Sequence, residues 1–209
     1  MIIRLPGPVR QHLAALRALL VFTVLLGVLY PLMVFGIGQL AFPAQANGSL
    51  VTVGDRVVGS SLLGQAFVDA QGNPAPQWFQ PRPSAASDPS NKNDPGYNPL
   101  FSGASNLGPS NPDLITSIDA RRAAVAAFDG VPAASVPPDA VTASGSGLDP
   151  DISPAYASEQ VTRVAKARGL DPSVVRALVA AHVQGRTLGI LGEPRVNVVE
   201  LNAALARLP

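Results

Sequence analysis

The feature that most constrains this sequence is an uncharged apolar run from Leu19 to Leu40. It spans 22 residues, among which only Thr23 and Gln39 carry clearly polar side chains. An α-helix of this length measures about 33 Å, which is enough to cross a hydrocarbon core of roughly 30 Å. We therefore expect a transmembrane helix over residues 19–42. The residues expected to anchor it in lipid are Leu19, Phe22, Leu26, Tyr30, Phe35 and Leu40.

The charges on either side of this run predict its orientation. Three arginines and no acidic residue precede it, whereas all 14 acidic residues follow it, beginning at Asp55. Because Lys and Arg beside a span remain on the cytoplasmic side, residues 1–18 are expected to form a basic cytoplasmic tail. Residues 47–209 then form a periplasmic or extracellular domain. The expected location is the inner or plasma membrane, crossed once.

A cleaved signal peptide is the competing interpretation of the same segment. Ala44-Gln45-Ala46 has the small-x-small form of a cleavage site, and basic residues precede the apolar run. However, the apolar region of a signal peptide is typically about 7–15 residues long, and this run is longer. A retained anchor is therefore favoured, and a soluble product beginning at Asn47 would contradict it.

The composition of the rest of the chain limits the classes of function. About 163 residues follow the anchor, which suits one domain with its own core. The chain has no cysteine, so disulfides and thiolate metal sites are excluded. The net charge of +1 and the lack of a basic stripe beyond the tail argue against nucleic acid as a partner.

The domain is predicted to mix helices and strands. Residues 50–53 and 56–58 flank Gly54-Asp55, which suits a two-residue hairpin turn of type II′. Residues 84–112 are rich in Ser, Asn, Asp, Gly and Pro and are expected to form a long irregular loop. A short strand is expected at 140–142. The predicted fold class is α+β (mixed α/β), carried on a single N-terminal transmembrane helix.

Four helices are predicted from their capping signals. Each begins with Asn, Ser or Asp, three of them directly before a proline, and three end at a glycine. Glu200, three residues after Asn197, adds a capping box to the last one. The expected ranges are Asn111 to Gly130, Ser153 to Gly169, Asp171 to Gly185, and Asn197 towards Leu208.

The search for catalytic or ligand-binding motifs yields none that is specific. Gly-x-Ser-x-Gly and Walker A patterns are absent. An exterior hydrolase would need His182 as its base, yet its spacing places it on the apolar face of a helix. Asp149 and Asp151 favour a turn over a calcium site, and the Gly/Ser run at 143–147 is only a weak anion-nest candidate. No catalytic, cofactor-binding or metal-binding residue is therefore predicted.

Several stretches together resemble the C subunit (KdpC family) of the Kdp potassium-transporting P-type ATPase. Their order and spacing, together with the single N-terminal span, cover nearly the whole chain. The sequence departs from the family pattern at Ala104, Asp151, Val199 and Ala203. The stretches are GSSLLGQAF at 59–67, RPSA at 82–85, SGASNLGPSNP at 102–112, TASGSGLDP at 142–150 with ISP at 152–154, and LGEPRVNV at 191–198 with ELN at 200–202.

This resemblance implies an accessory, non-catalytic subunit of a high-affinity potassium uptake pump. Its partners would be a channel-like potassium-binding subunit, an ATP-hydrolysing P-type subunit, a small single-span subunit and the lipid bilayer. The chain needs no cofactor of its own, while the complex uses ATP and potassium. The family's proposed "catalytic chaperone" role, raising the pump's affinity for ATP, would have to act by coupling through the membrane, since the domain is expected outside.

The polar loops 84–112 and 142–154 are expected to contact these partners and to shape the external potassium entrance. Two alternatives remain open: a generic membrane-anchored exterior binding module, and an anchored hydrolase that depends on His182. The residues predicted to contact partners are Ser102, Ser105, Asn106, Ser110, Asn111, Ser144, Ser146 and Asp149.

Overall fold

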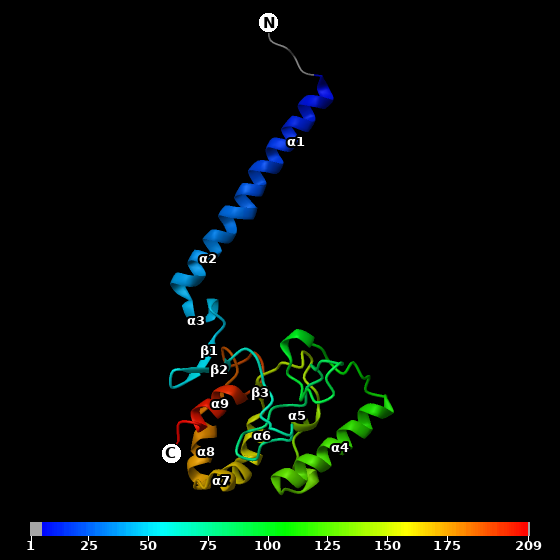
Figure 1. Ribbon diagram of the computed structural model, residues 1–209, viewed down its shortest axis with the longest axis vertical. Coiled ribbons are helices and arrows are strands. Elements are labelled where there is room, and N and C mark those ends of the chain that lie inside the picture. Colours follow the sequence, from blue (N-terminus) through cyan, green and yellow to red (C-terminus); the bar gives the residue numbers. More distant parts are fainter. Residues whose placement is uncertain (1–5, 209) are drawn as a thin grey trace. The chain divides into compact units, whose positions relative to one another are not determined.

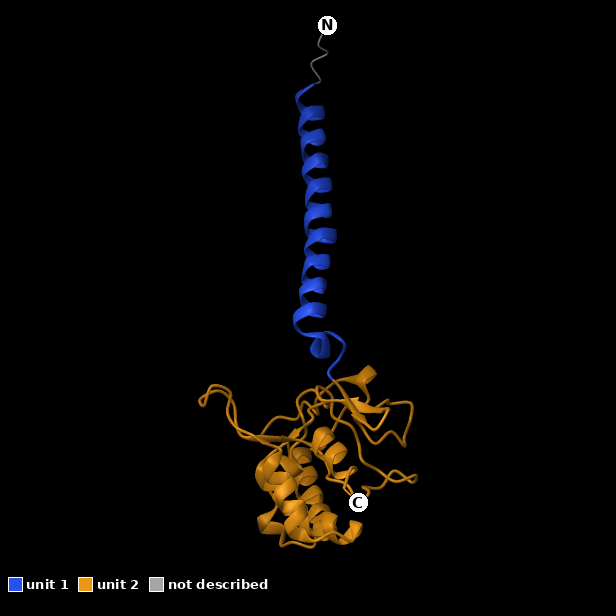
Figure 2. Cartoon of the chain, turned by 90° about the vertical axis from the view of Figure 1, so that its left-hand side faces the viewer, with its two compact units in different colours: residues 1–49 blue, residues 50–209 orange. Residues whose placement is uncertain are grey.

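A computed structural model describes residues 6–208. The first five residues of the predicted basic tail, which include Arg4, lie outside the described residues. The chain divides between Ser49 and Leu50 into two compact units (Figure 2), and each is described by itself.

The first unit consists of a continuous apolar helix and a short helical turn. The helix runs from Gly7 to Ala41, 35 residues with a mean hydropathy of 2.5 in its most apolar window, and none of that window is buried. The helix therefore begins well before Leu19, the residue at which the membrane span was predicted to start. Its segments are α1 (Gly7–Val24), a π-helical stretch (Leu25–Leu29) and α2 (Tyr30–Ala41), and the turn is α3 (Pro43–Ala46).

The π-helical stretch lies next to Pro31. Proline has no N–H to give to the carbonyl four residues earlier, and its ring crowds that carbonyl. The backbone responds one residue before it, where the Tyr30 N–H bonds to the carbonyl of Leu25, five residues back. The helix ends at Ala41, and the next residue, Phe42, has a non-helical φ of −136° and precedes Pro43.

The six predicted anchor residues are all exposed in this unit, from 57% for Tyr30 to 88% for Leu40. From residue 18 to its end the helix carries no charged residue. Large apolar side chains exposed along such a stretch indicate a lipid environment rather than water. The helix therefore fits a single-pass membrane protein.

The second unit confirms the predicted α+β class. The predicted hairpin is present as β1 (Leu50–Val53) and β2 (Arg56–Ser60), paired so that Val53 faces Arg56. Gly54 has a φ of +59°, as the first turn position requires.

A second, antiparallel sheet was not predicted. Its order is β3-β5-β4, with Ile152 and Val183 both paired to Val196 in the central strand. The strands are β3 (Asp151–Ile152), β4 (Val183–Gln184) and β5 (Arg195–Asn197).

Four helices of this unit begin at the capping residues that the sequence indicated. Each of the four predicted caps accepts a backbone N–H two or three residues ahead, at 2.7–3.1 Å. The caps are Asn111, Ser153, Asp171 and Asn197. Along the chain the helices are α4 (Pro112–Asp129), α5 (Pro138–Val141), α6 (Pro154–Glu159), α7 (Val161–Arg168), α8 (Pro172–Ala181) and α9 (Val198–Leu205), with 3₁₀ turns η2 (Pro99–Phe101) and η3 (Ala133–Ser135) (Figure 1).

Three local predictions are wrong. The strand expected at 140–142 is absent, because Pro138 starts the short helix α5, which includes Ala140 and Val141. The Thr142 hydroxyl closes that helix by donating to the Pro138 carbonyl at 2.8 Å. The helix expected over 153–169 is divided into α6 and α7 at Gln160, whose ψ is −13°.

The third error concerns the end of α8. This helix stops at Ala181 rather than near Gly185, because Val183 joins the sheet by pairing with Val196. His182 is therefore the residue that terminates the helix, with φ −100° and ψ 1°, and not a member of its apolar face.

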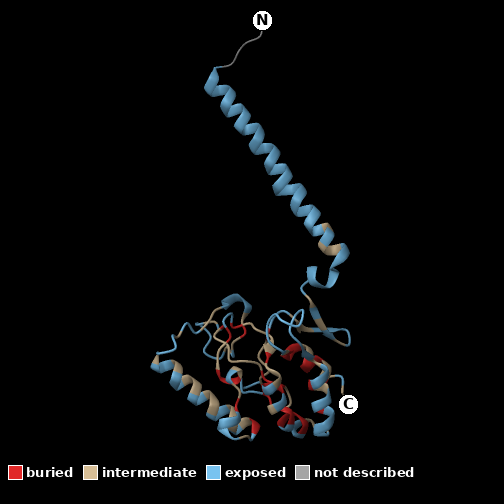
Figure 3. Ribbon diagram, turned by 180° about the vertical axis from the view of Figure 1, so that it is seen from behind, coloured by how far each residue is buried: buried red, intermediate tan, exposed pale blue. Residues whose placement is uncertain are grey.

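The hydrophobic core of the second unit lies among α6, α7, α8, α9 and the central strand β5. Figure 3 shows buried residues gathered in these elements, while α4 is mostly exposed on its outer side. The largest fully buried apolar side chains are Phe79, Leu201, Leu205, Val164, Val175, Val196, Val198 and Val199.

Buried amide side chains hold the irregular segment 75–80 against this core. Asn202 accepts the Phe79 N–H and donates to the Phe79 carbonyl, both at 2.9 Å. The Gln160 side chain likewise accepts the Gln80 N–H at 2.6 Å and donates to the Gln80 carbonyl at 3.1 Å. Because a buried backbone group without a partner costs about 1–3 kcal/mol, these two amides replace the pairing that a neighbouring strand would have given. This role also explains why the helix is interrupted at Gln160.

Candidate functional site

The two polar loops predicted to contact partners meet at the hydroxyl of Ser84. This hydroxyl donates to the Gly147 carbonyl at 2.7 Å and accepts the N–H groups of Ala86 and Tyr97 at 3.1 and 3.0 Å. The Tyr97 hydroxyl donates in turn to the Arg82 carbonyl at 2.8 Å. One side chain thus fixes the loop 142–154 to two separate points of the loop 84–112.

The loop 84–112 makes a second contact with the loop 142–154, at the Ser146 carbonyl. The Ser102 hydroxyl and the Gly103 N–H both donate to the Ser146 carbonyl, at 2.9 Å each. The fit is close at Gly147, where an added Cβ would lie 2.8 Å from the Gly103 carbonyl oxygen. We call this junction of residues 82–86, 97–103 and 142–149 the loop junction.

The serines at 144–146 organise their own loop. The buried Ser144 hydroxyl accepts the N–H groups of Gly147 and Asp149 at 3.1 and 3.4 Å, and Ser146 accepts that of Leu148 at 3.1 Å. The Ser144 N–H itself donates to the Pro83 carbonyl. An anion nest needs free N–H groups, and within the candidate run 143–147 those of Ser144 and Gly147 are already occupied. The geometry therefore favours a structural turn over a phosphate site.

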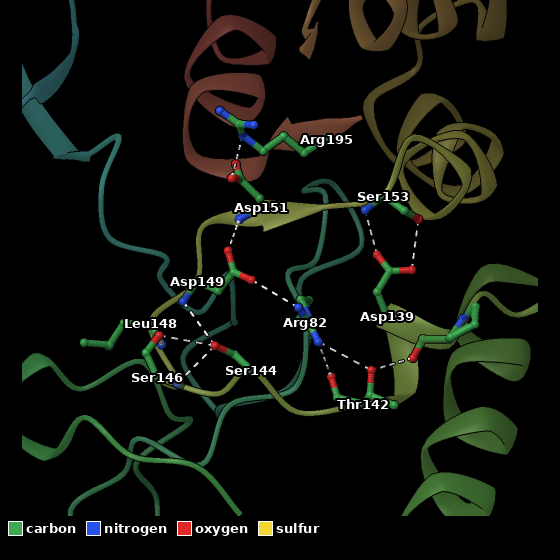
Figure 4. A network of polar contacts seen from close by, with 12 residues as sticks. Arg82, Asp139, Thr142, Ser144, Ser146, Leu148, Asp149, Asp151, Ser153 and Arg195 are labelled. Atoms are coloured by element: carbon green, nitrogen blue, oxygen red, sulfur yellow. Dashed lines mark hydrogen bonds and ion pairs between the residues drawn. The ribbon is translucent and has the colours of Figure 1, made fainter. Parts of the chain in front are cut away.

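Charged groups border the loop junction on the side of the second sheet (Figure 4). The Arg82 guanidinium pairs with Asp149 at 3.1 Å, and Arg195 pairs with Asp151 at 3.0 Å. Asp149 also accepts the N–H of Asp151 at 3.0 Å, which is the turn predicted for this pair. Because each carboxylate already faces a guanidinium, the pair is a poor ligand set for calcium.

A further carboxylate, Asp139, fixes the start of α6. It accepts the Ser153 N–H at 2.6 Å and the Ser153 hydroxyl at 2.9 Å, while that hydroxyl caps the helix. The helix α5, the strand β3 and the helix α6 are thereby joined through two side chains.

The predicted partner-contact residues fall into two groups. Ser102, Ser144, Ser146 and Asp149 are brought together in the loop junction. The others continue along the first loop towards α4, with exposed side chains except for the half-buried Asn111 that caps α4, and with a left-handed backbone (φ +54°) at Asn106. That second group is Ser105, Asn106, Ser110 and Asn111.

Two residues of the loop junction were not singled out from the sequence: Arg82 and Ser84. Ser84 donates to the Gly147 carbonyl and Arg82 pairs with the Asp149 carboxylate, both distant in the sequence, so neither residue type nor spacing marks them. The available signal was the RPSA stretch at 82–85, which contributed to the family resemblance.

His182 has an ordinary structural contact. Its Nδ1 lies 2.8 Å from the carbonyl oxygen of Leu178, so that nitrogen carries the proton and donates to the last turn of α8. The bond closes the helix end at this position. Nothing in this geometry supports the hydrolase alternative.

Glu159, at the end of α6, carries a carboxyl oxygen that is buried without a hydrogen-bond partner. Burial, reinforced by the negative charges of Asp129 and Asp139, raises the pKa of Glu159 to about 7. A carboxyl whose pKa is raised in the folded state favours folding while it is protonated, and this contribution is lost as the pH rises from about 4.5 through 7.

We therefore expect Glu159→Gln to stabilise the second unit at pH 8 and to have little effect at pH 4.5. Because the side chain is partly exposed, the expected gain is roughly 1 kcal/mol, or about 2–4 °C in Tm. Thermal unfolding of both proteins at the two pH values measures it. Equal Tm differences at both values would show that the charge of Glu159 is not the cause.

Nearly the whole chain matches one protein family. Residues 12–207 match the family described as KdpC, the K⁺-transporting ATPase c chain. The chain belongs to the KdpC family. The match extends over most of the apolar helix and over the loop junction and the core, so all three lie within the part of the chain that this family describes.

Similar proteins from several bacteria have nearly the same length. The potassium-transporting ATPase KdpC subunit of Kineococcus radiotolerans is 55% identical over 205 residues, covering 98% of this chain and 97% of that protein. The subunit of the same name from Beijerinckia indica is 49% identical, covering 95% of both chains. That of Streptomyces coelicolor is 46% identical, covering 98% of this chain and 95% of its own.

Proposed function

We propose that this chain is the accessory, non-catalytic C subunit of an ATP-driven potassium uptake pump. The observation that carries the proposal is the family match from residue 12 to residue 207, on a chain with one exposed apolar N-terminal helix. Its partners are a channel-like potassium-binding subunit, an ATP-hydrolysing subunit and a small single-span subunit. The lobe formed by residues 50–209 stabilises their assembly.

The proposed topology places the N-terminus in the cytoplasm and the lobe outside. It is supported by the charge distribution, since no acidic residue precedes the apolar helix and all 14 follow it. On that side the lobe reaches arriving potassium and the external loops of its partners, but not ATP. Any effect on ATP affinity therefore acts by coupling between subunits that have two states.

Protease added to intact spheroplasts tests this topology. The lobe is expected to be digested from outside and protected in inside-out vesicles. The reverse pattern would place the lobe beside the ATP-hydrolysing machinery and would contradict the proposal of indirect coupling.

Copurification in mild detergent tests the function itself. The tagged chain is expected to bring down the other pump subunits in fixed proportion, and cells lacking it are expected to lose growth at low external potassium. A generic anchored binding module would come out alone. That outcome would reject the accessory-subunit proposal.

The exposed part of the loop 84–112 is a specific candidate for the partner contact. We expect the triple change Asn106→Ala, Ser110→Ala and Asn111→Ala to weaken copurification severalfold and to lower the pump's apparent affinity for potassium. The physical reason is the loss of side-chain donors and acceptors at a polar interface rim. Pull-down yield and potassium-dependent ATP hydrolysis measure the two effects.

Loss of the helix cap must be separated from loss of the contact, because replacing a capping Asn by Ala costs about 1 kcal/mol. Asn111→Asp keeps a capping oxygen and is the matched control. If the triple variant assembles normally and retains its potassium affinity, this part of the loop has no role in the interface.

A further inference from the structure

Three segments of the second unit expose large apolar side chains. The hairpin between β4 and β5 carries Leu188, 86% exposed, and Ile190, 75% exposed. The 3₁₀ turn η2 carries Leu100, 86% exposed, and the turn after β2 carries Leu62, 62% exposed. We call these four residues the apolar rim.

The hairpin is built to present its tip. Its base is closed by a bridge between Thr187 and Leu191 and by an ion pair of 2.7 Å between Arg186 and Glu193. At the tip Leu188 adopts a φ of +54°, which a leucine rarely does. No charged residue lies between Arg186 and Glu193, so the tip is an uncharged apolar projection on a closed base.

The apolar rim lies at one end of the unit. In Figure 1 the orange-brown hairpin, the green turn η2 and the strands β1 and β2 are at the same end, opposite the junction of α7 and α8. Isolated exposed leucines need no explanation, but several on separate loops at one end indicate a contact surface.

That end is also where the chain enters the unit. Leu50 is the first residue of β1, and eight residues, 42–49, connect it to the end of the apolar helix. Even fully extended, eight residues span at most about 29 Å. The covalent connection therefore limits how far Leu50 can lie from the end of the apolar helix.

We propose that the apolar rim inserts into the bilayer surface beside the anchor and forms a second, peripheral contact of this chain with lipid. The partner is the boundary between headgroups and acyl chains, which accepts Leu and Ile side chains. Because the ion pair at the base of the hairpin is neutral overall, the contact depends on apolar burial and not on anionic lipid. Two contacts, the helix and the rim, restrict the rotation of the lobe over the membrane.

The absence of cysteine from the sequence allows a direct test. Leu188→Cys, labelled with an environment-sensitive fluorophore, gives one probe at the tip of the hairpin in the full chain reconstituted into phosphatidylcholine nanodiscs. We expect blue-shifted emission, at least twofold quenching by lipids with nitroxide near the top of the acyl chain, and weak quenching by iodide in solution. Replacing a third of the lipid by phosphatidylglycerol should leave these values unchanged.

Val174→Cys is the matched control, because Val174 is 44% exposed on the first turn of α8, at the opposite end of the unit. Its label is expected to be quenched by iodide and not by the lipid nitroxide. A Leu188 probe that behaves like the Val174 probe would overturn the proposal.

The same probe distinguishes lipid from a protein partner. If the Leu188 label is shielded from iodide only in the assembled pump, and never quenched by the lipid nitroxide, the rim docks on a neighbouring subunit and the lipid proposal is wrong. The test with the chain alone does not require assembly, so it is independent of the proposed function.

Discussion

Replacing Arg163 with Met is expected to destabilise the lobe by about 3–5 kcal/mol, enough to unfold many domains of this size. Arg163 is only 8% exposed, and its Nε lies 2.5 Å from a carboxylate oxygen of the buried Asp129. Its guanidinium also lies over the ring of Phe128, 4.4 Å from the centroid. Removing the cation leaves a buried negative charge with no partner.

The same guanidinium satisfies backbone groups of the irregular segment before Phe79. It donates to the carbonyls of Pro76 and Trp78 at 2.6 and 2.9 Å and to Gln160 Oε1 at 2.6 Å. Methionine fills similar space but donates nothing. The hydrogen bonds lost in the variant therefore also weaken the attachment of segment 75–80, which Asn202 and Gln160 hold against the core.

The effect should depend on pH, because burial raises the pKa of Asp129 more than Arg163 lowers it. Without Arg163 this pKa rises further, so the variant is expected to lose more stability at pH 8 than at pH 5. Urea unfolding of the parent and the variant, followed by the fluorescence of Trp78, measures the loss of stability at each pH. Trp78 is the one tryptophan in the sequence.

Two further variants identify the cause. Arg163→Met with Asp129→Leu removes both charges and is expected to recover a large part of the loss. Arg168→Met removes a cation that lies over Trp78 at 5.0 Å in a more exposed position, and should cost less than about 1 kcal/mol. A single Arg163 variant as stable as the parent would show that this network contributes little.

The parts of the fold that were predictable from sequence are those in which the signal and the structure are local. The apolar run determines the helix of the first unit, and Asn111, Ser153 and Asp171 mark helix starts because a capping side chain bonds only two or three residues ahead. The two-residue turn at Gly54 is recognisable for the same reason.

The parts that were missed depend on contacts between distant residues. The helix break at Gln160 exists because its side chain serves the backbone of Gln80, 80 positions earlier, and the strands of the second sheet are two or three residues long. Such strands are too short to show a period of two. Tertiary contacts, which one sequence does not display, decide both.

The candidate site divides in the same way. The richness of loops 84–112 and 142–154 in Ser, Asn and Gly indicated irregular backbone, and the structure joins Ser102 to Ser146 through one hydrogen bond. The residue at the centre of the junction, Ser84, was not singled out, because a serine among prolines has no distinctive spacing.

The second large effect is expected from Gly147→Ala, at the centre of the loop junction. Gly147 has a φ of +70°, which costs an alanine about 1 kcal/mol or more. The added Cβ would lie 2.6 Å from the Cβ of Ala86 and 2.8 Å from the Gly103 carbonyl oxygen, in space that is already filled. Overpacking of this kind typically costs a further 1–3 kcal/mol, so the expected destabilisation is about 2–4 kcal/mol.

This variant also tests the proposed role of the loops, because Ala86 and Gly103 belong to the other loop and must move to admit the methyl group. If the loop junction presents the partner-binding surface, copurification with the pump subunits should fall more steeply than the population of folded lobe. Gly145→Ala is the matched control: its Cβ has no neighbour within 4 Å, and its φ lies outside the positive range. Equal losses of assembly and of folded protein in the Gly147 variant would assign the junction to stability alone, whereas a Gly145 variant with the same defect would point to backbone flexibility of the loop instead of its packing.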